Sequence, residues 1–102
     1  MLRPERDDSL SNYRIFEADG FIDDLAEICG SRLEQIYAKI KRYIYPQLSR
    51  QPYFGKNIKK LKGFSPEIWR YRLGNIRLFY QIDDKGRIVI MTAAYPRKDA
   101  YR

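Results

Sequence analysis

The sequence has 102 residues, with 20 Lys and Arg against 13 Asp and Glu, no His, and one cysteine, Cys29. This length predicts one compact domain, and the single cysteine excludes an internal disulfide and a cluster of cysteine metal ligands. Histidine is the commonest metal ligand and the commonest group that exchanges protons near neutral pH. Because the chain has none, we expect no metal and no cofactor. No apolar run approaches the roughly 20 residues of a membrane span, and the polar N-terminus is unlike a signal peptide. We therefore expect a cytoplasmic protein with no membrane partner.

The charge is distributed unevenly along the chain. Residues 1–37 have a balance of −5 and residues 38–102 a balance of +12, which together give the net charge of +7. This asymmetry predicts that the second part binds a polyanion. Interleaved Arg and Tyr favour nucleic acid over a membrane surface or an acidic protein, because guanidinium groups fit phosphates and aromatic rings stack on bases. A solvated basic surface that only maintains solubility is the alternative.

The first half of the chain predicts an arm, a strand and two helices. Residues 1–12 show no periodicity and predict a flexible N-terminal arm, followed by a domain over residues 13–102. The β-rich run 13–18 predicts a short strand, and helical spacing of apolar residues from 21 onward predicts a helix that ends at Gly30. The segment Ser31–Glu34 matches a capping box. It predicts the start of a second helix, which runs to Leu48 and which Pro46 kinks or ends.

The second half of the chain predicts strands. Residues 49–66 are expected to be a connecting segment, and segments 68–73, 76–82 and 88–93 then alternate with a period of two. Gly74-Asn75 is a two-residue hairpin turn, and residues 83–86 form a second turn. The order β-α-α-β-β-β predicts an α+β domain, in which an N-terminal strand and a helical hairpin pack on an antiparallel sheet.

The Gly74-Asn75 turn predicts the register of the first hairpin, with Arg72 opposite Arg77. Side chains alternate between the faces of a strand, so one face is a core face: Trp69, Tyr71, Leu73, Ile76, Leu78, Tyr80 and Ile82. The other face has Arg70, Arg72, Arg77, Phe79 and Gln81. Like charges directly opposite each other are unfavourable, so we expect an anion between Arg72 and Arg77. The alternative is a solvated face that the acidic first helix balances.

Four segments of the sequence resemble a known family. They are Lys59–Gly63 (KKLKG), Trp69–Gly74 (WRYRLG), Ile76–Ile82 (IRLFYQI) and Arg97–Arg102 (RKDAYR). Over residues 13–102 the chain resembles the RelE/ParE superfamily, the small bacterial toxins of type II toxin–antitoxin pairs. The RelE-like branch is the better match. It implies a RelE-like fold and a growth-inhibiting mRNA endonuclease that acts on the ribosome, where the 2′-hydroxyl of the mRNA attacks the adjacent phosphate.

The resemblance also implies site residues. Matching positions predict a catalytic set of Arg70, Arg72, Arg77, Arg97 and Tyr101, and an RNA-binding set of Lys56, Lys59, Lys60, Lys62, Lys98 and Tyr95. The RelE-like branch has lysines where this chain has Arg70 and Arg72, and guanidinium is a good charge clamp but a poor general base. The family's Gly-His-Arg ending is replaced by Ala94–Arg97 (AYPR), which excludes a C-terminal histidine mechanism. For Tyr95, a hydrophobic plug at the edge of the sheet is an equally good interpretation.

Two other functions fit the same residues. One is a ParE-like inhibitor of DNA gyrase with no chemistry of its own, and the other is a degenerate member that only binds an antitoxin. All three share a predicted partner, an acidic antitoxin whose charge complements residues 38–102. The expected assembly is a monomer or a toxin–antitoxin hetero-oligomer, with mRNA on the ribosome, or gyrase, as the target.

Overall fold

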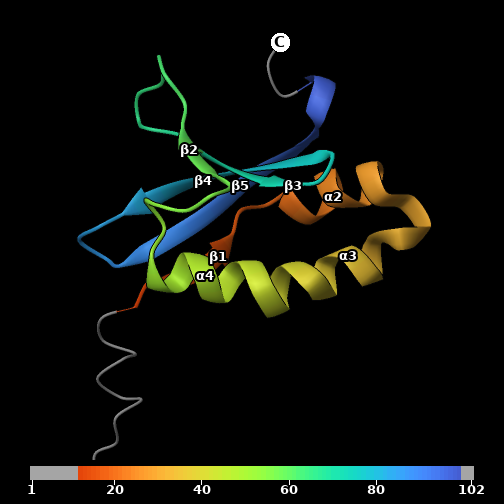
Figure 1. Ribbon diagram of the computed structural model, residues 1–102, viewed down its shortest axis with the longest axis horizontal. Coiled ribbons are helices and arrows are strands. Elements are labelled where there is room, and N and C mark those ends of the chain that lie inside the picture. The colour runs from red at the N-terminus through yellow and green to blue at the C-terminus, as the bar shows by residue number, and fades with distance from the viewer. Residues whose placement is uncertain (1–11, 100–102) are drawn as a thin grey trace, which may run out of the picture.

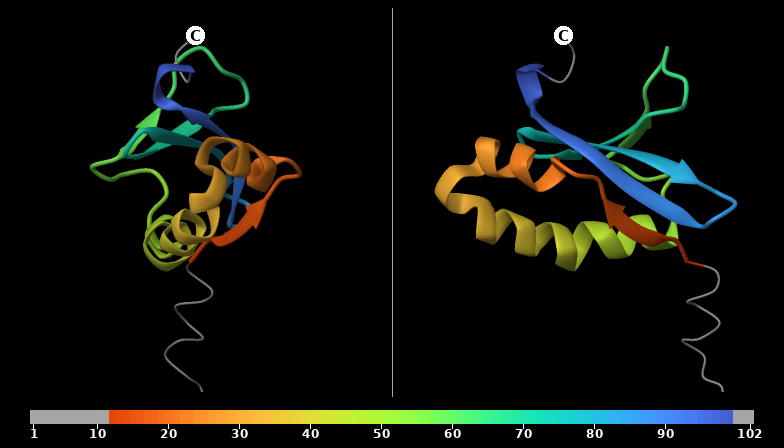
Figure 2. Two further views of the ribbon diagram at one scale, coloured as in Figure 1. Left: turned by 90° about the vertical axis from the view of Figure 1, so that its right-hand side faces the viewer. Right: turned by 180° about the vertical axis from the view of Figure 1, so that it is seen from behind.

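In the computed structural model, which describes residues 12–99, helices cover one face of a sheet (Figure 1). The elements are β1 (Arg14–Glu17), α2 (Phe21–Cys29), η1 (Gly30–Arg32), α3 (Leu33–Lys39), η2 (Ile40–Ile44), α4 (Tyr45–Arg50), β2 (Ile58–Lys60), β3 (Trp69–Leu73), β4 (Ile76–Asp83), β5 (Ile88–Pro96) and η3 (Arg97–Asp99). The opposite, outer face of the sheet lies on the side where the β2–β3 loop and η3 project (Figure 2). Apart from Asn12, the predicted arm lies outside the described residues.

The sheet has five strands in the order β1-β5-β4-β3-β2. The α+β class is confirmed, with two differences from the expected sheet. It is mixed, because β1 pairs with β5 in parallel while the other pairs are antiparallel. It also has β2, a three-residue strand inside the segment expected to be only a connection. Two of its three residues are charged, so β2 has no apolar alternation that would reveal a strand.

The two expected helices are present, but the second differs in detail. The first ends at Gly30, whose φ of +57° suits glycine. The capping box at Ser31 is wrong: a 3₁₀ turn leads from α2 directly into α3, which begins at Leu33 without a side-chain cap. Of the two effects expected of Pro46, a kink or an end of the helix, the end is absent. A π-type turn comes before it, and Pro46 then lies in the first turn of α4, where its missing N–H costs least.

The core lies between the helices and the inner face of the sheet. The most deeply buried side chains are Phe21, Leu25, Ile40, Leu48, Leu78, Tyr80, Val89 and Met91, each 0 % exposed. The predicted hairpin register is confirmed, with Arg72 opposite Arg77 and Trp69 opposite Tyr80. The predicted core face is confirmed as well, because all seven of its residues belong to the core or pack against it. Burying each large apolar side chain stabilises the fold by about 1.5–3 kcal/mol. This energy fixes the apolar face of the hairpin toward the core, and the arginines therefore lie on the opposite face.

Two polar networks connect the strands to the rest of the fold. Asp84, in the β4–β5 turn, accepts hydrogen bonds of 2.5 Å from the hydroxyls of Tyr13 and Tyr53. Glu17, in β1, accepts hydrogen bonds of 2.7 Å from the hydroxyls of Tyr37 and Tyr45. The first network ties the residue before β1 and the loop after α4 to the β4–β5 turn, and the second ties β1 to α3 and α4. Within residues 12–99, no helix is long and apolar enough to cross a membrane.

Candidate nucleic-acid interface

The outer face of the sheet brings together side chains from four strands. Lys59 of β2 lies opposite Arg70 of β3, which lies opposite Phe79 of β4. In the next row, Arg72 of β3 lies opposite Arg77 of β4, which lies opposite Tyr95 of β5. Residues at paired positions point to the same face of a sheet. The predicted common face for Arg70, Arg72 and Arg77 is therefore confirmed, and Lys59 and Tyr95 join it. We call this face the arginine face.

Arg72 and Arg77 differ in exposure although they are neighbours. Arg72 is exposed, whereas Arg77 is only 5 % exposed. The Arg77 Nη1 atom donates hydrogen bonds to the backbone carbonyls of Gly74, at 2.8 Å, and Ile76, at 3.2 Å. Its Nε atom is buried and has no hydrogen-bond partner among residues 12–99. The interpretation of this row as a wholly solvated face is thus wrong for Arg77, which packs down beside the β3–β4 turn.

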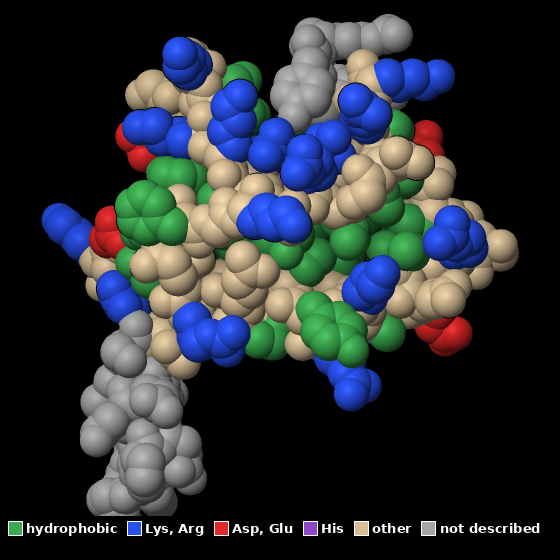
Figure 3. All heavy atoms as spheres, in the orientation of Figure 1, with side chains coloured by type: hydrophobic (Ala, Val, Ile, Leu, Met, Phe, Trp, Pro, Cys, Tyr) green, Lys and Arg blue, Asp and Glu red, His purple; other side chains and the backbone are tan. Residues whose placement is uncertain are grey.

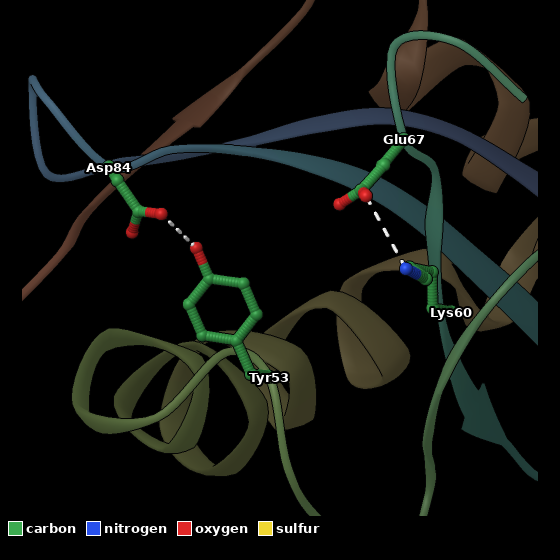
Figure 4. A network of polar contacts seen from close by, with 4 residues as sticks. All are labelled: Tyr53, Lys60, Glu67 and Asp84. Carbon is green, nitrogen blue, oxygen red and sulfur yellow. Dashed lines mark hydrogen bonds and ion pairs between the residues drawn. The ribbon is translucent and has the colours of Figure 1, made fainter.

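A buried guanidinium normally lies beside a carboxylate, because a buried charge without a partner is costly. Between described side chains the structure records one ion pair, Lys60 with Glu67 at 3.3 Å (Figure 4). Among the side chains that the structure describes, which end at Lys98, neither Arg72 nor Arg77 has a carboxylate partner. The row therefore concentrates positive charge that an external anion can balance.

Phe79 and Tyr95 give the arginine face an aromatic surface. Their rings are 5.4 Å apart between centroids and tilted by 47°, and Tyr95 remains 42 % exposed. Tyr95 therefore packs as the plug interpretation requires, while the rest of its ring is available for stacking on a base. Phe79 was placed on this face by the sequence but was not recognised as a candidate site residue. Its position opposite Arg70 was the available signal.

Arg97 and Lys98 follow directly after β5 and are exposed. The backbone N–H of Arg97 donates to the carbonyl of Asn75 at 2.7 Å, so η3 begins beside the β3–β4 turn. This contact brings the late cations to the end of the sheet where Arg72 and Arg77 lie. Tyr101, the remaining predicted catalytic residue, lies outside the described residues.

The predicted lysines divide between several places. Lys56 precedes β2 and Lys62 follows it, both exposed, and the loop that continues to β3 carries Phe64, 54 % exposed. Lys60 lies opposite Trp69, so it points to the other face, where it pairs with Glu67.

The β2–β3 loop and η3 rise on either side of the outer face (Figures 1 and 2). Lys and Arg side chains gather along this side of the molecule (Figure 3). Phe64 is a second aromatic residue that sequence reasoning missed, although it directly follows a lysine-rich run.

The chemistry of these groups is that of a charge clamp. Guanidinium and ammonium groups donate hydrogen bonds and stay protonated at neutral pH. The described part of the site can therefore hold a phosphate and stabilise negative charge that develops on it, but these cations do not accept a proton. Residues 12–99 contain no group of three or more His, Cys, Asp or Glu placed to hold a metal ion.

Comparison with known proteins relates this fold to solved structures. No protein-family model matches the chain, and no curated protein does. The toxin–antitoxin complex RelBE2 of Mycobacterium tuberculosis matches with a TM-score of 0.68 and 24 % identity, over 86 % of this chain and 94 % of that one. The RelB–RelE complex of Methanococcus jannaschii matches with a TM-score of 0.58 and 26 % identity, over 84 % and 94 %. The isolated RelE toxin of E. coli matches with a TM-score of 0.58 and 20 % identity, over 82 % and 83 %. The predicted RelE-like fold is confirmed.

Proposed function

We propose that this chain, whose fold is that of the RelE toxins, is the toxin of a type II toxin–antitoxin pair and cleaves mRNA on the ribosome. The observation that supports this most directly is the arginine face. Arg72 and Arg77 lie directly opposite each other without a carboxylate partner among the described residues. Arg97 begins η3 beside the same turn. Such a cluster of cations suits the phosphate backbone of a nucleic acid.

In the proposed reaction, the 2′-oxygen of the mRNA forms a bond to the adjacent phosphorus, and the bond from phosphorus to the 5′-oxygen breaks. The products are a cyclic phosphate and a free 5′-hydroxyl, which takes up a proton as it leaves. Arg70, Arg72, Arg77 and Arg97 would stabilise the charge on the pentacoordinate phosphorus, an effect of the kind that contributes about 10²–10³ in rate for one donor. Because guanidinium cannot accept the 2′-hydroxyl proton, this proton passes to an RNA phosphate oxygen or to a group of the ribosome.

The proposed toxin has an antitoxin as partner. Several structures of the same fold are complexes of a RelE protein with a RelB protein. In this chain the cations of the arginine face complement an acidic polypeptide, whose binding would compete with RNA by charge. The assembly is then a toxin–antitoxin hetero-oligomer, and the free toxin is its active form.

One observation favours a second function, the inhibition of DNA gyrase. No histidine exists in the chain, and the strand positions occupied by lysine in RelE-like enzymes are Arg70 and Arg72. A protein that only binds its target needs no general base. The arginines at these positions and the lack of histidine would therefore not reduce its inhibition of gyrase.

The test adds the purified protein to a cell-free translation reaction and maps the mRNA ends by primer extension, with a gyrase supercoiling assay in parallel. New 5′ ends within translated regions, lost in Arg72→Ala but retained in Arg50→Ala, are the expected result. Arg50 is a matched control because it is an exposed arginine at the end of α4, in the helical layer. Intact mRNA with blocked supercoiling would instead assign the gyrase function. Intact mRNA together with normal supercoiling would indicate a protein that binds an antitoxin and has no activity of its own.

A further inference from the structure

The alternation of β5 between the two faces of the sheet is interrupted once. Val89 and Met91 are buried and lie two positions apart. The next buried residue of this strand is Ala94, three positions after Met91. A regular strand alternates with a period of two, so β5 contains one extra residue between Met91 and Ala94.

Thr92 is this extra residue. Ala93 pairs with Phe79 of β4, and Met91 pairs with Tyr80, the next residue of β4. Thr92 therefore has no partner in the ladder, and its Oγ1 atom donates a hydrogen bond of 3.2 Å to the backbone carbonyl of Phe79. An extra residue on one of two paired strands is a β-bulge, and bulges beside functional sites re-aim side chains. We call it the Thr92 bulge.

The Thr92 bulge decides which face of the sheet Tyr95 occupies. After the bulge, Ala94 is buried and Tyr95 lies opposite Arg77 on the arginine face. If the pairing before the bulge continued without it, every later residue would change faces. Tyr95 would then point into the core, and Ala94 would take its place beside Arg77.

The same bulge sets the position of η3. The backbone N–H of Arg97 donates to the carbonyl of Asn75 at 2.7 Å, which fixes the start of η3 beside the β3–β4 turn. In the register without a bulge, Pro96 would lie at this position, and proline has no N–H to donate. The extra residue therefore allows the end of β5 to bond to the hairpin.

Phe79 and Tyr95 form an aromatic pair on one half of the arginine face. Their ring centroids are 5.4 Å apart, and Tyr95 is 42 % exposed. The two rings come from β4 and β5, whereas the exposed Arg72 comes from β3. Exposed charge thus lies toward the β3 side of the face and the rings toward the β5 side. A nucleotide with its phosphate at Arg72 can lay its base on the rings.

We propose that Thr92 is a positioning residue for base recognition, because its bulge and its hydroxyl hold Phe79 and Tyr95 together as a stacking platform beside the cations. The ligand class, single-stranded RNA, rests on the proposed function, whereas the placement of the rings follows from the bulge alone. Thr92 acts through the two rings. It should therefore affect the recognition of bases and not the binding of phosphates.

The experiment measures the binding of two fluorescent oligomers to the full chain at one salt concentration. One is an oligouridine, and the other is an abasic oligomer with the same number of phosphates. Thr92→Val removes the hydroxyl with little change of shape, and Thr92→Ser retains a hydroxyl. Ser49→Ala is the matched control, because the Ser49 hydroxyl also donates to a backbone carbonyl, that of Tyr13 at 2.6 Å, but lies in α4. Circular dichroism confirms that each variant is folded.

We expect Thr92→Val to weaken binding of the oligouridine by about threefold and to leave binding of the abasic oligomer unchanged. Tyr95→Leu should weaken binding of the oligouridine by on the order of tenfold. Adding Thr92→Val to Tyr95→Leu should have no further effect, because Thr92 acts through the ring that is already missing. Thr92→Ser and Ser49→Ala should bind both oligomers as the wild type does.

Three results would overturn the proposal. Thr92→Val could bind the oligouridine as tightly as the wild type, it could lose affinity for both oligomers equally, or its effect could add fully to that of Tyr95→Leu. Equal loss for both oligomers would indicate a general structural effect. If Thr92→Val does not fold, Thr92→Ala carries the same expectations.

A measurement without RNA separates this inference from the proposed function. Nuclear Overhauser effects between the ring protons of Phe79 and Tyr95 should be present in the wild type and in Thr92→Ser, and weaker in Thr92→Val. Unchanged effects in Thr92→Val would refute the positioning role even if the protein cleaves mRNA. Intact mRNA, together with a ring contact and an oligouridine affinity that depend on Thr92, would reject the enzymatic function and support the positioning role.

Discussion

Arg72 and Arg77 are directly opposed across β3 and β4, and one is exposed while the other is buried against the backbone of its own turn. The two arginines therefore have different roles. Arg77 holds the Gly74 carbonyl and lies beneath the surface, and Arg72 presents its charge to whatever approaches the outer face. An anion that binds here interacts with the exposed guanidinium and is also attracted by the buried one.

The first prediction concerns anion binding by Arg72. In the absence of an anion, Arg72→Gln should be as stable as the wild type or more stable by a few tenths of a kcal/mol, because a like-charge pair is removed. Phosphate or a short RNA should then raise the melting temperature of the wild type more than that of the variant. Thermal denaturation with and without added anion measures both effects. Equal shifts in Arg72→Gln and wild type, with Arg50→Gln as control, would show that the anion binds elsewhere.

The second prediction concerns the energetic role of Arg77. Arg77→Met loses hydrogen bonds from a charged donor, each worth about 1.5–3 kcal/mol, but it also removes a buried Nε without a partner, which costs about 1–3 kcal/mol. The two hydrogen bonds outweigh the cost of the unpartnered Nε, so we expect the free energy of unfolding to fall by about 2 kcal/mol. Cleavage of mRNA should also fall by about 10² or more.

Urea denaturation and the primer-extension assay together decide the role of Arg77. A loss of 3 kcal/mol or more, the usual cost of breaking a paired buried charge, would mean that Arg77 is needed for folding and that its partner lies outside the described residues. Arg72→Met, at the opposed exposed position, provides the matched comparison.

The hairpin that carries these arginines could be predicted because its determinants are local. The Gly74-Asn75 turn sets the register, and strict alternation on both sides of it assigns the faces, with Tyr71, Leu78 and Tyr80 inward. A one-residue slip would have moved the apolar set into solvent, so the pattern allowed a single register. The burial of Arg77 could not be predicted in this way, because it depends on packing around the turn and not on the strand.

Other features depend on contacts that are distant in sequence. β2 is only three residues long and becomes a strand because Lys59 pairs with Arg70. The partner of β1 could not be identified, since Ile15 pairs with Val89 at the far end of the chain. At Ser31 the local capping pattern was overridden, because a continuous 3₁₀ turn links α2 to α3 and no free helix end remains there.

The third prediction concerns acid stability. Hydrogen bonds from Tyr13 and Tyr53, with a smaller contribution from Arg87, hold the pKa of Asp84 below its usual range, against a small opposing effect of desolvation. A carboxyl with a depressed folded-state pKa stabilises the fold fully above its unfolded pKa of about 4. This stability is lost as the pH falls through the lower folded value. Asp84→Asn should therefore flatten the dependence of the urea midpoint on pH below about 4. Asp83→Asn, its exposed neighbour, serves as control, and an unchanged slope in Asp84→Asn would contradict the prediction.

The fourth prediction concerns the two tyrosines that share Glu17. Desolvation, together with the hydrogen bond to Glu17 and its charge, raises the pKa of Tyr37 to about 12 and also raises that of Tyr45. The corresponding stability is present below the unfolded pKa of about 10 and is lost as the pH rises through the folded values. Glu17→Gln keeps an acceptor but removes the charge, so phenolate absorbance should develop at lower pH than in the wild type. Superimposable titrations of Glu17→Gln, wild type and Glu27→Gln, an exposed control on α2, would refute this role for Glu17.

The parallel pairing of β1 with β5 has a consequence for biosynthesis. β1 is made before the other described strands, but its sheet partner, Ile88–Pro96, is made after all of them. Contacts between such distant segments form late, because the chain between them must first be closed into a loop. The sheet, and with it the row that β5 completes through Tyr95, therefore closes only after the last of its strands has been made, so that a partly synthesised chain lacks the complete arginine face.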